Sequence, residues 1–274
     1  MSMVFDLKAR LQEMGIAPKK AFGQNFLVNP LVIKKIIEEV RARSFSDLIE
    51  IGPGLGALTE PLLSAEMHPR LIELDRDLVE YWRGRGLTVV DGDAIKLDWS
   101  TLELKPQSLL VSNLPYQIST HLVVDRCFGP QNLKYMVLMF QKEVAQKLTA
   151  QPRTSEYGLL TVMAQTYFKI QRVADAAPKD FYPPPKVASR VLAFERLPDP
   201  GLGEKYLKFL KGAFAFRRKF LLKNLKSVVD KTNSERLPEL FNELGLSEKA
   251  RAEELTVAQF AALFKKVYEH QNHK

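Results

Sequence analysis

The residues best suited to chemistry form one short run, Asn113-Leu114-Pro115-Tyr116, directly after an apolar stretch that is predicted to be a strand. An exocyclic aromatic amine, such as that of adenine, is a poor nucleophile because its lone pair is delocalised into the ring, and it presents two N–H donors. The side-chain carbonyl of Asn113 can accept one hydrogen, while Pro115 biases Leu114 towards an extended backbone that can aim the Leu114 carbonyl at the same amine. Tyr116 offers an aromatic face on which a base can stack. The run therefore indicates a grip on an aromatic NH2 group, although a plain proline turn with a packing tyrosine is the alternative.

A glycine-rich turn, Gly52-Pro53-Gly54-Leu55-Gly56, follows an earlier apolar run and precedes a helical pattern. Such spacing lets the backbone turn tightly and pass close to a ligand, but it also fits a dinucleotide fingerprint or a simple strand-to-helix turn. Glu73 ends the next apolar run, about 20 residues on, where a carboxylate can accept hydrogen bonds from both ribose hydroxyls. Asp93 follows the third run and can accept from an adenine amine. We interpret Asp75 as a solvated surface acid.

These groups favour transfer of a methyl group that is already activated on a sulfonium, so S-adenosylmethionine is the expected cofactor. Positioning in line at about 3 Å would then carry most of the catalysis, with no general base or metal required. Zinc-dependent deamination, the other common adenine chemistry, needs His or Cys ligands and a CxxC element. The chain has a single cysteine, Cys127, which lies in an apolar helical pattern and is expected to be buried, and its four histidines lack ligand spacing. We therefore expect no metal site.

Short apolar runs alternate with helical patterns from residue 30 to about residue 197. This alternation predicts an α/β fold with a mostly parallel, doubly wound sheet, whose ligand lies at the carboxyl ends of the strands. The predicted strands are Asp47–Ile51, Arg70–Leu74, Leu87–Val90, Ser108–Val111, Tyr135–Phe140, Thr166–Val173 and Arg190–Glu195. The predicted helices are Leu31–Ala42, Ala57–Ser64, Asp77–Trp82, Thr120–Phe128, Lys142–Ala150 and Tyr157–Ala164.

A stretch rich in helix breakers, Leu197–Gly203, separates this pattern from a segment in which every apolar pattern is helical. We therefore predict two domains, residues 1–200 for cofactor binding and catalysis and residues 201–274 as a small all-helical domain for RNA binding. Within the second, Thr256–Gln259 has the form of a capping box, and Gly245 is a plausible helix stop.

The excess positive charge of the chain lies in one part of the predicted helical domain. The net charge is +8, and residues 205–231 contain nine Lys or Arg against one acid, Asp230, which leaves 31 basic and 31 acidic residues elsewhere. Apolar residues within this segment recur at helical spacing, so the cations would stand on the opposite faces. Clustered positive charge indicates a polyanion partner, although a solvated basic helix pair is the alternative. The candidate RNA-binding residues are Arg217, Arg218, Lys219 and Lys223.

Taken together, these motifs resemble the ribosomal RNA adenine N6,N6-dimethyltransferase family, specifically its bacterial KsgA branch. The resemblance covers nearly the whole chain. Besides the elements above it rests on four segments, Phe22–Leu27, Gln141–Glu143, Phe181–Ser189 and Phe216–Lys219. One departure is Gln117, which stands where many members carry asparagine.

The resemblance implies a Rossmann-like class I methyltransferase sheet and a set of residue roles. Asn25, Leu27, Gly52, Gly54, Glu73, Asp93 and Asn113 would bind the cofactor. Asn113, Leu114, Pro115 and Tyr116 would act on the target adenine, and Phe181 would stack on it opposite Tyr116. Family knowledge further implies dimethylation of two adjacent adenosines near the 3′ end of small-subunit ribosomal RNA, in an assembling 30S particle and with a role in ribosome biogenesis.

Three other functions stay open from the sequence. A methyltransferase of the antibiotic-resistance type, acting on large-subunit RNA, shares the Asn-x-Pro-Tyr logic. A non-catalytic assembly checkpoint factor could keep the fold, but Asn113 and Glu73 are both present; a nicotinamide dehydrogenase is separable by cofactor titration. Met1–Arg10 has no signal-peptide pattern and no stretch approaches a membrane span, so we expect a cytoplasmic protein, not bound to membranes and acting as a monomer.

Overall fold

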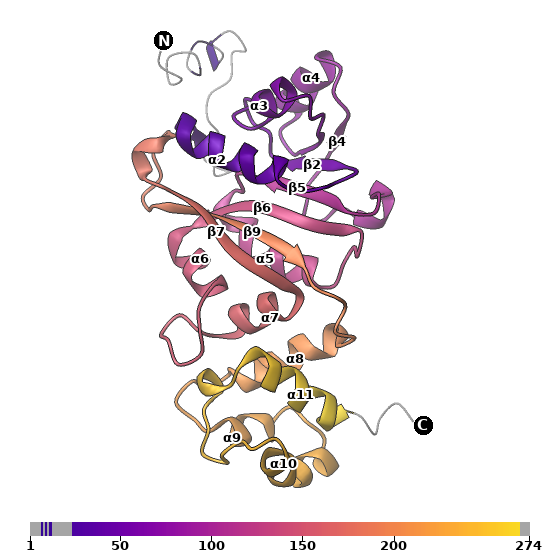
Figure 1. Cartoon of the computed structure of the whole chain (residues 1–274), viewed down its shortest axis with the longest axis vertical. Coiled ribbons are helices and arrows are strands. Elements are labelled where there is room, and N and C mark those ends of the chain that lie inside the picture. The colour runs from indigo at the N-terminus through magenta and orange to yellow at the C-terminus, as the bar shows by residue number, and fades with distance from the viewer. Residues whose placement is uncertain (1–6, 8, 10, 13–23, 269–274) are drawn as a thin grey trace. The chain divides into compact units, whose positions relative to one another are not determined.

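The structure, a computed structural model, describes residues 7, 9, 11–12 and 24–268 (Figure 1). The chain divides into two compact units. The first unit comprises Met1–Ala145 and Ile170–Arg196, and the second comprises Gln146–Lys169 and Leu197–Lys274. Phe22 and Gly23, which belong to the family resemblance, lie outside the described residues, as does most of Met1–Arg10.

A seven-stranded sheet forms the centre of the first unit, in the order β4-β3-β2-β5-β6-β9-β7. Its strands are β2 (Leu48–Ile51), β3 (Arg70–Glu73), β4 (Val89–Asp91), β5 (Ser108–Ser112), β6 (Leu133–Gln141), β7 (Phe168–Ala176) and β9 (Ser189–Arg196). The first five strands in the spatial order pair in parallel, whereas β9 pairs antiparallel with β6. A separate two-stranded ribbon joins β1 (Phe26–Leu27) to β8 (Phe181–Tyr182). The predicted doubly wound, mostly parallel sheet is confirmed.

The order of the strands reverses between β2 and β5. From β2 the chain continues outward through β3 to β4, whereas from β5 it continues to β6 on the other side. The loops that leave the carboxyl ends of β2 and β5 therefore diverge, and in open α/β sheets this divergence creates the ligand crevice. Helices cover both faces of the sheet. In the first unit these include α2 (Pro30–Arg41), α3 (Thr59–Ser64), α4 (Arg76–Gly84) and α5 (Tyr116–Cys127), while α6 (Lys142–Leu148) crosses the division.

Helix α2 shows how the sequence specifies this layer. Asn29 caps its first turn by accepting from the backbone N–H groups of Leu31 and Val32, and Pro30 occupies the first helical position, where no N–H is needed. Its buried face packs with strand residues that include Val137 and Met139 on β6. These two residues alternate with Met136 and Leu138, so one side of the strand meets α2, and α5 lies on the other side of the sheet (Figure 1).

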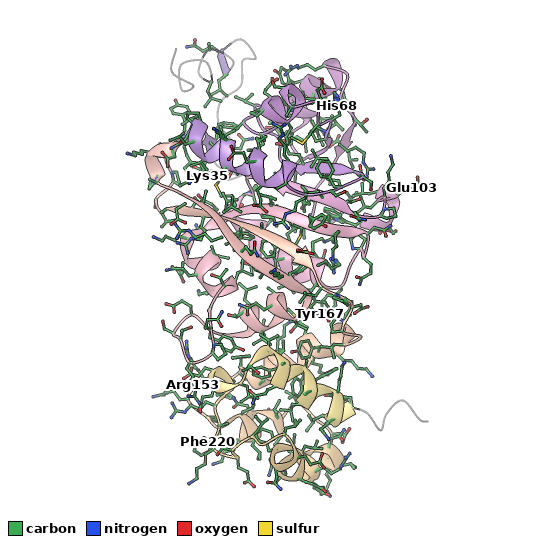
Figure 2. All side chains as sticks on the ribbon, in the orientation of Figure 1. Lys35, His68, Glu103, Arg153, Tyr167 and Phe220 are labelled. Atoms are coloured by element: carbon green, nitrogen blue, oxygen red, sulfur yellow. The ribbon has the colours of Figure 1, made fainter. Side chains whose placement is uncertain are left out.

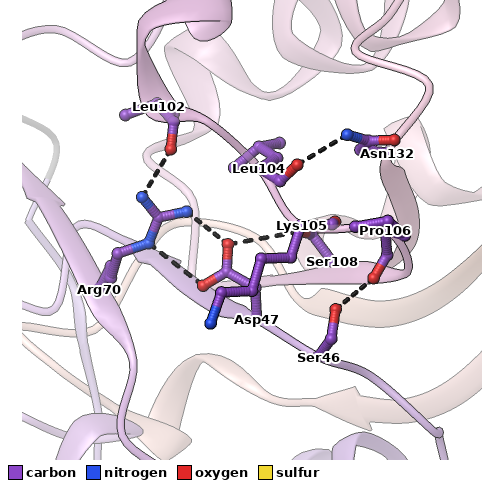
Figure 3. Close-up of polar contacts among 9 residues, drawn as sticks. All are labelled: Ser46, Asp47, Arg70, Leu102, Leu104, Lys105, Pro106, Ser108 and Asn132. Carbon is purple, nitrogen blue, oxygen red and sulfur yellow. Dashed lines mark hydrogen bonds and ion pairs between the residues drawn. The ribbon is translucent and has the colours of Figure 1, made fainter.

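A polar network connects the amino ends of the central strands β3, β2 and β5 (Figure 3). Arg70, at the start of β3, forms an ion pair with Asp47 next to β2 and donates 2.7 Å to the Leu102 carbonyl. Ser108, at the start of β5, also donates to Asp47, at 3.3 Å. One carboxylate thus ties together the beginnings of three neighbouring strands and stabilises their register.

The second unit is helical in its described residues after Leu197. Its helices are α7 (Leu159–Tyr167), α8 (Gly203–Ala213), α9 (Leu221–Leu225), α10 (Lys231–Glu243) and α11 (Val257–Tyr268). The capping box at the start of α11 is confirmed, because Thr256 N donates to Gln259 Oε1 and Gln259 N donates to Thr256 Oγ1. Gly245 follows α10 with φ +63°, as expected at a helix end. No helix among the described residues is both long and apolar enough to cross a membrane.

The second unit also includes Gln146–Lys169, which the sequence alone assigns to the first domain. The physical reason is packing: Tyr157 donates from its hydroxyl to the Leu255 carbonyl at 2.8 Å, and the hydroxyls of Thr166 and Tyr206 lie 3.4 Å apart. Apolar periodicity shows that this segment is helical but not which core it joins. The domain boundary predicted at residue 200 lies close to Leu197, where the second of the two segments of the second unit begins.

Gly212 in α8 generates a prediction for the second unit. A Cβ at this position would lie 2.4 Å from both methyl carbons of Val228, far inside van der Waals contact. Replacing a helical glycine by alanine usually stabilises a helix by up to about 1 kcal/mol, but overpacking costs about 1–3 kcal/mol. We expect Gly212→Ala to lower the thermal unfolding midpoint, measured by circular dichroism, and Gly212→Ala with Val228→Ala to recover most of that loss. A single variant as stable as the wild type would contradict the packing described.

Candidate active site

A pocket with a volume of about 290 Å³ lies at the carboxyl ends of the parallel strands, in the first unit. The structure thus has a crevice where the sequence predicts the ligand, at the place where the strand order reverses. It gathers most of the residues singled out from the sequence. Those that line it are Asn25, Gly52, Gly54, Glu73, Asp93, Asn113, Leu114, Pro115 and Tyr116.

The glycine-rich turn after β2 forms one wall with its backbone. Gly52 and Gly54 have φ values of +62° and +55°, which favour glycine over residues with a side chain. Gly52 N donates 2.9 Å to the Ile72 carbonyl, and the buried Trp82 indole N–H donates 2.9 Å to the Gly54 carbonyl. A Cβ placed on Gly52 would meet no atom within 4 Å, so the turn presents open backbone that a ligand can approach.

Glu50, which received no role from the sequence, is the most perturbed acid of the site. It is 2% exposed, lines the pocket, and accepts a 2.8 Å hydrogen bond from the buried Thr59 hydroxyl. Desolvation raises the pKa of Glu50 to about 8, the Thr59 hydrogen bond opposes the shift, and the nearby Glu73 adds to it. A signal was present in the sequence, because Glu50 interrupts a short, otherwise apolar strand that is covered on both faces.

Glu73 is held in place by the chain that follows it. Its Oε1 accepts from the backbone N–H groups of Leu74 and Asp75, at 2.8 and 2.9 Å, and burial raises its pKa despite these hydrogen bonds. The interpretation of Asp75 as a surface acid is wrong: it is 2% exposed and caps α4 by accepting from Asp77 N. An Asp before a helix is a typical cap, but the sequence pattern does not show whether such a cap is buried.

Asp93 and several apolar side chains form the far wall. Asp93 accepts from Ile95 N at 2.9 Å, which fixes its carboxylate at the end of β4. Ile72, Leu74 and Ala94 line the same pocket, and Leu74 is exposed despite its size. Polar groups that alternate with apolar surface suit a nucleoside, whose ring is flat and apolar while its edge and sugar carry donors.

Asn113 has a fixed orientation. Its side-chain nitrogen donates 3.0 Å to the Asn25 carbonyl, which can only accept, so this contact assigns the amide. Since the two polar atoms of an amide point apart, the side-chain oxygen is directed away from Asn25. The predicted acceptor for an aromatic amine is therefore held in one arrangement by a residue 88 positions earlier in the chain.

Tyr116 begins helix α5, four residues earlier than predicted, because Pro115 can precede a helix without a backbone N–H. Its hydroxyl lies 2.7 Å from the Ser189 hydroxyl at the start of β9, which anchors the ring. Burial raises the pKa of Tyr116, with the Ser189 hydrogen bond opposing the shift, so the phenol stays neutral. Gln117, treated from the sequence as a local difference, also lines the pocket.

Two predicted site residues are core residues here. Leu27 and Phe181 are partners in the β1–β8 ribbon and are 1% and 3% exposed. Both belong to the hydrophobic cluster that packs on α2, and neither lines the pocket. Stacking of Phe181 on a target base stays a prediction, and in this structure its ring lies in the core. The neighbouring Phe26 does line the pocket and would be 3.0 Å from a Cβ on Gly54.

The predicted RNA-binding cations lie in the second unit, between α8 and the middle of α9. Arg218, Lys219 and Lys223 are exposed. Arg217 is exposed too, but it forms a 2.6 Å ion pair with Glu253 and donates 3.3 Å to the Thr154 carbonyl. Its charge is thus partly compensated by an acid 36 residues away, which the local sequence did not reveal.

Cys127 is buried, as predicted, and desolvation raises its pKa to about 12, so the thiol is not a nucleophile. Within the described part of the chain, no group of three or more His, Cys, Asp or Glu side chains is arranged to hold a metal ion.

The raised pKa of Glu50 predicts how stability depends on pH. Between the ordinary value of 4.5 and about 8, the folded protein binds a proton that the unfolded chain does not, so the free energy of unfolding falls as pH rises through this range. Glu50→Gln keeps an acceptor for Thr59 and removes the ionisation, so this fall should shrink by up to a few kcal/mol. Urea unfolding at pH 5 and pH 9, followed by the fluorescence of Trp82 and Trp99 in the first unit, checks this.

Glu80→Gln, which changes an exposed acid on α4, is the matched control and should leave the pH dependence of unfolding unchanged. Equal pH dependence in the wild type and Glu50→Gln would mean that Glu50 does not titrate as described.

Comparison with known proteins places the chain in a family. A sequence model described as "Ribosomal RNA adenine dimethylase" matches residues 16–269. The ribosomal RNA small subunit methyltransferase A of Bdellovibrio bacteriovorus is 50% identical over 260 residues, covering 93% of this chain and 95% of the relative. The protein of the same name from Vibrio cholerae is 40% identical over 261 residues, covering 91% and 93%.

Solved structures agree with the sequence comparison. A dimethyladenosine transferase from Plasmodium falciparum superposes with a TM-score of 0.77 at 25% identity, covering 90% of this chain and 98% of that chain. The 23S rRNA methyltransferase ErmE superposes with a TM-score of 0.65 at 24% identity, covering 89% and 99%, and this likeness concerns the fold alone. With a family model that matches nearly the whole chain and a relative at 50% identity, this chain belongs to the ribosomal RNA adenine dimethylase family.

Proposed function

We propose that the chain transfers methyl groups from S-adenosylmethionine to the N6 amine of two adjacent adenosines near the 3′ end of small-subunit (16S) ribosomal RNA. The observation that carries this proposal is the fixed amide of Asn113. Its oxygen is oriented by the contact with Asn25, and it lines the same pocket as the glycine-rich turn. An oriented acceptor beside a nucleoside-sized crevice is the arrangement that methylation of an aromatic amine requires.

The groups that line the pocket suit S-adenosylmethionine. Gly52 offers open backbone, Glu73 a fixed carboxylate for the ribose, and Asp93 an acceptor for the adenine amine. Glu50 adds a buried acid whose ionisation would be favoured by a cationic ligand. When bound, this cofactor supplies a methyl group already activated on a positively charged sulfur.

The residues after β5 would hold the target. The Asn113 oxygen accepts one hydrogen of the adenine amine, the Leu114 carbonyl accepts the second, and the Tyr116 ring supports the base. Accepting both hydrogens holds the nitrogen out of the plane of the ring and restores its lone pair for attack. The neutral Tyr116 phenol is bound to Ser189, and no titrating base is needed at the amine. Rate then comes from positioning.

The nature of the RNA follows from the relatives. A small-subunit substrate is favoured over a large-subunit one because the 50% identical protein carries the small-subunit name over almost its full length. The presence of Asn113 and Glu73 in an ordered pocket argues against a purely structural checkpoint role. We further propose that the enzyme acts as a monomer without a metal ion, on an assembling 30S particle in the cytoplasm, where it contributes to ribosome biogenesis.

Asn113→Ala tests the central assignment. It removes the oriented acceptor but leaves the glycine turn, Glu73 and the basic segment intact. By analogy with loss of one preorganised hydrogen-bonding group, the rate of methyl transfer should fall by about a hundredfold or more. Methylation of small-subunit RNA by mass mapping, together with calorimetric titration of S-adenosylmethionine and a separate RNA-binding assay, measures this.

Two further variants sharpen that test. Asn113→Asp keeps an acceptor but loses the N–H that binds Asn25, so it should fall between the wild type and Asn113→Ala. Thr120→Ala, at an exposed position of helix α5, which follows the Asn113 turn, should transfer methyl groups at the wild-type rate. Wild-type activity in Asn113→Ala would contradict the role given to Asn113. A wild-type protein that does not bind S-adenosylmethionine would contradict the proposed reaction itself.

The exposed cations predict a salt dependence of RNA binding. Each phosphate contact contributes about 0.7–0.9 to the slope of log K against log salt concentration. Arg218→Ala with Lys219→Ala should flatten the slope by up to about two units, while Arg217→Ala changes it less because Glu253 already pairs with that side chain. Lys249→Ala, an exposed cation outside the basic segment, is the control. A slope unchanged in the double variant would argue against phosphate contacts here.

A further inference from the structure

The loop between α8 and α9, which we define as residues 214–220, carries an aromatic side chain that folding does not use. Phe216 is 56% exposed and is the one aromatic residue among the exposed large hydrophobic residues of the described chain. Its neighbours in the loop, Phe214 and Phe220, are partly buried, and Phe214 packs on Phe260 with ring centroids 5.3 Å apart. Phe216 therefore exposes apolar surface to water, and burying this surface would be favourable.

The backbone of this exposed residue is nevertheless held rigidly. The Phe216 carbonyl accepts from Lys219 N at 3.0 Å and from the Asn224 side-chain nitrogen at 3.0 Å. Asn224 is buried and also donates 2.9 Å to the Ala213 carbonyl, so one amide ties the end of α8 to Phe216. A ring on a fixed backbone loses little conformational entropy when it binds, which is what a preorganised contact needs.

A cation lies over the ring. Lys219 Nζ is 4.1 Å from the centroid of the Phe216 ring, and Arg218, the residue before Lys219, is exposed. The arrangement repeats four residues later, where Lys223 Nζ lies 5.9 Å from the centroid of Phe220, the residue labelled in Figure 2. Each pair puts a flat apolar face next to a positive charge, matching a nucleotide, which joins a flat base to a phosphate.

We propose that Phe216 is a stacking platform for an unpaired base of the RNA, separate from the pocket where methyl transfer takes place, with Lys219 contacting the phosphate of the stacked nucleotide. This inference rests on the proposed function, because that function supplies RNA as the ligand. Bases in a duplex are already stacked on one another, so the platform selects single-stranded or looped RNA. It is sequence-tolerant, since every base has a flat face.

A protein partner fits this surface less well. Single exposed apolar residues are common and do not make a protein interface, which needs a contiguous apolar centre. The segment from residue 205 to 231 contains nine cations and one acid, a charge pattern that favours a polyanion.

Substitutions at Phe216 separate stacking from charge. Phe216→Ala should weaken binding of a short single-stranded oligoadenylate about tenfold, equivalent to about 1.4 kcal/mol, at constant salt slope. Phe216→Leu keeps an apolar side chain without a π face and should behave like Phe216→Ala. Phe216→Trp should bind at least as tightly as the wild type. Leu197→Ala, which shortens another exposed apolar residue of the second unit, is the matched control and should bind normally.

Fluorescence gives a direct readout of stacking. The two native tryptophans, Trp82 and Trp99, are buried, so wild-type emission supplies the background for the Phe216→Trp variant. Oligoadenylate should quench the added emission, whereas an adenine–uracil duplex with the same number of phosphates should quench it much less.

The outcomes are distinguishable from failure of the proposed function. If the wild type binds RNA but Phe216→Ala or Phe216→Leu binds equally well, the platform is refuted while the enzyme assignment stands. Equal quenching by single strand and duplex also refutes it, as does a Phe216→Ala effect that appears only as a flatter salt slope. If the wild type binds no RNA, the proposed function itself fails.

Discussion

The whole site depends on the divergence of the loops that follow two neighbouring strands, β2 and β5. The two strands run side by side in parallel, and the Ser112 hydroxyl donates 2.6 Å to the Ile51 carbonyl, which locks their carboxyl ends together. One residue further along each strand the chains diverge, into the glycine turn at Gly52 and into Asn113. Because both turns start from a single hydrogen-bonded point, the ligand-facing backbone and the oriented amide have a fixed spacing that neither loop could maintain alone.

A second constraint is electrostatic. Glu50 and Glu73 lie near the carboxyl ends of the adjacent strands β2 and β3, are both buried, and each has a raised pKa, with desolvation as the main cause. Two acids kept out of water at one edge of the sheet are costly without a compensating partner. The fixed hydrogen bonds from Thr59 to Glu50 and from backbone N–H groups to Glu73 offset part of that cost. A positively charged ligand would offset the remaining cost of burying the two acids, so we expect the pocket to prefer such a ligand.

The sequence was enough to predict site residues whose positions depend on local turn and strand patterns. It was not enough to predict burial, which depends on tertiary packing. Strand ends with Gly52, Glu73 and Asn113 could be placed, because turn residues and strand length are written locally. Burial of Asp75 and Phe181 could not, since it depends on tertiary contacts: Asp75 accepts 3.5 Å from the Gln24 side chain, 51 positions earlier, and Phe181 pairs with Leu27 in β1. Helix α5 begins at Tyr116, directly after Pro115. The sequence pattern predicted a later start, because the first turn of the helix contains polar residues that hide its apolar periodicity. Membership of Gln146–Lys169 in the second unit likewise required knowledge of tertiary contacts.

The two units work under different physical regimes. In the first, the groups that we propose to act on a base are neutral or internally bonded, so their effect would come from orientation and be little screened by salt. In the second, we propose that exposed Arg218, Lys219 and Lys223 attract phosphates through charge, an attraction that would weaken as salt is added. Charge alone cannot distinguish looped from duplex RNA, since both carry phosphates. A rigid aromatic ring among the cations can, because only an unstacked base has a face to offer, and the methylation chemistry needs an unstacked adenine as well.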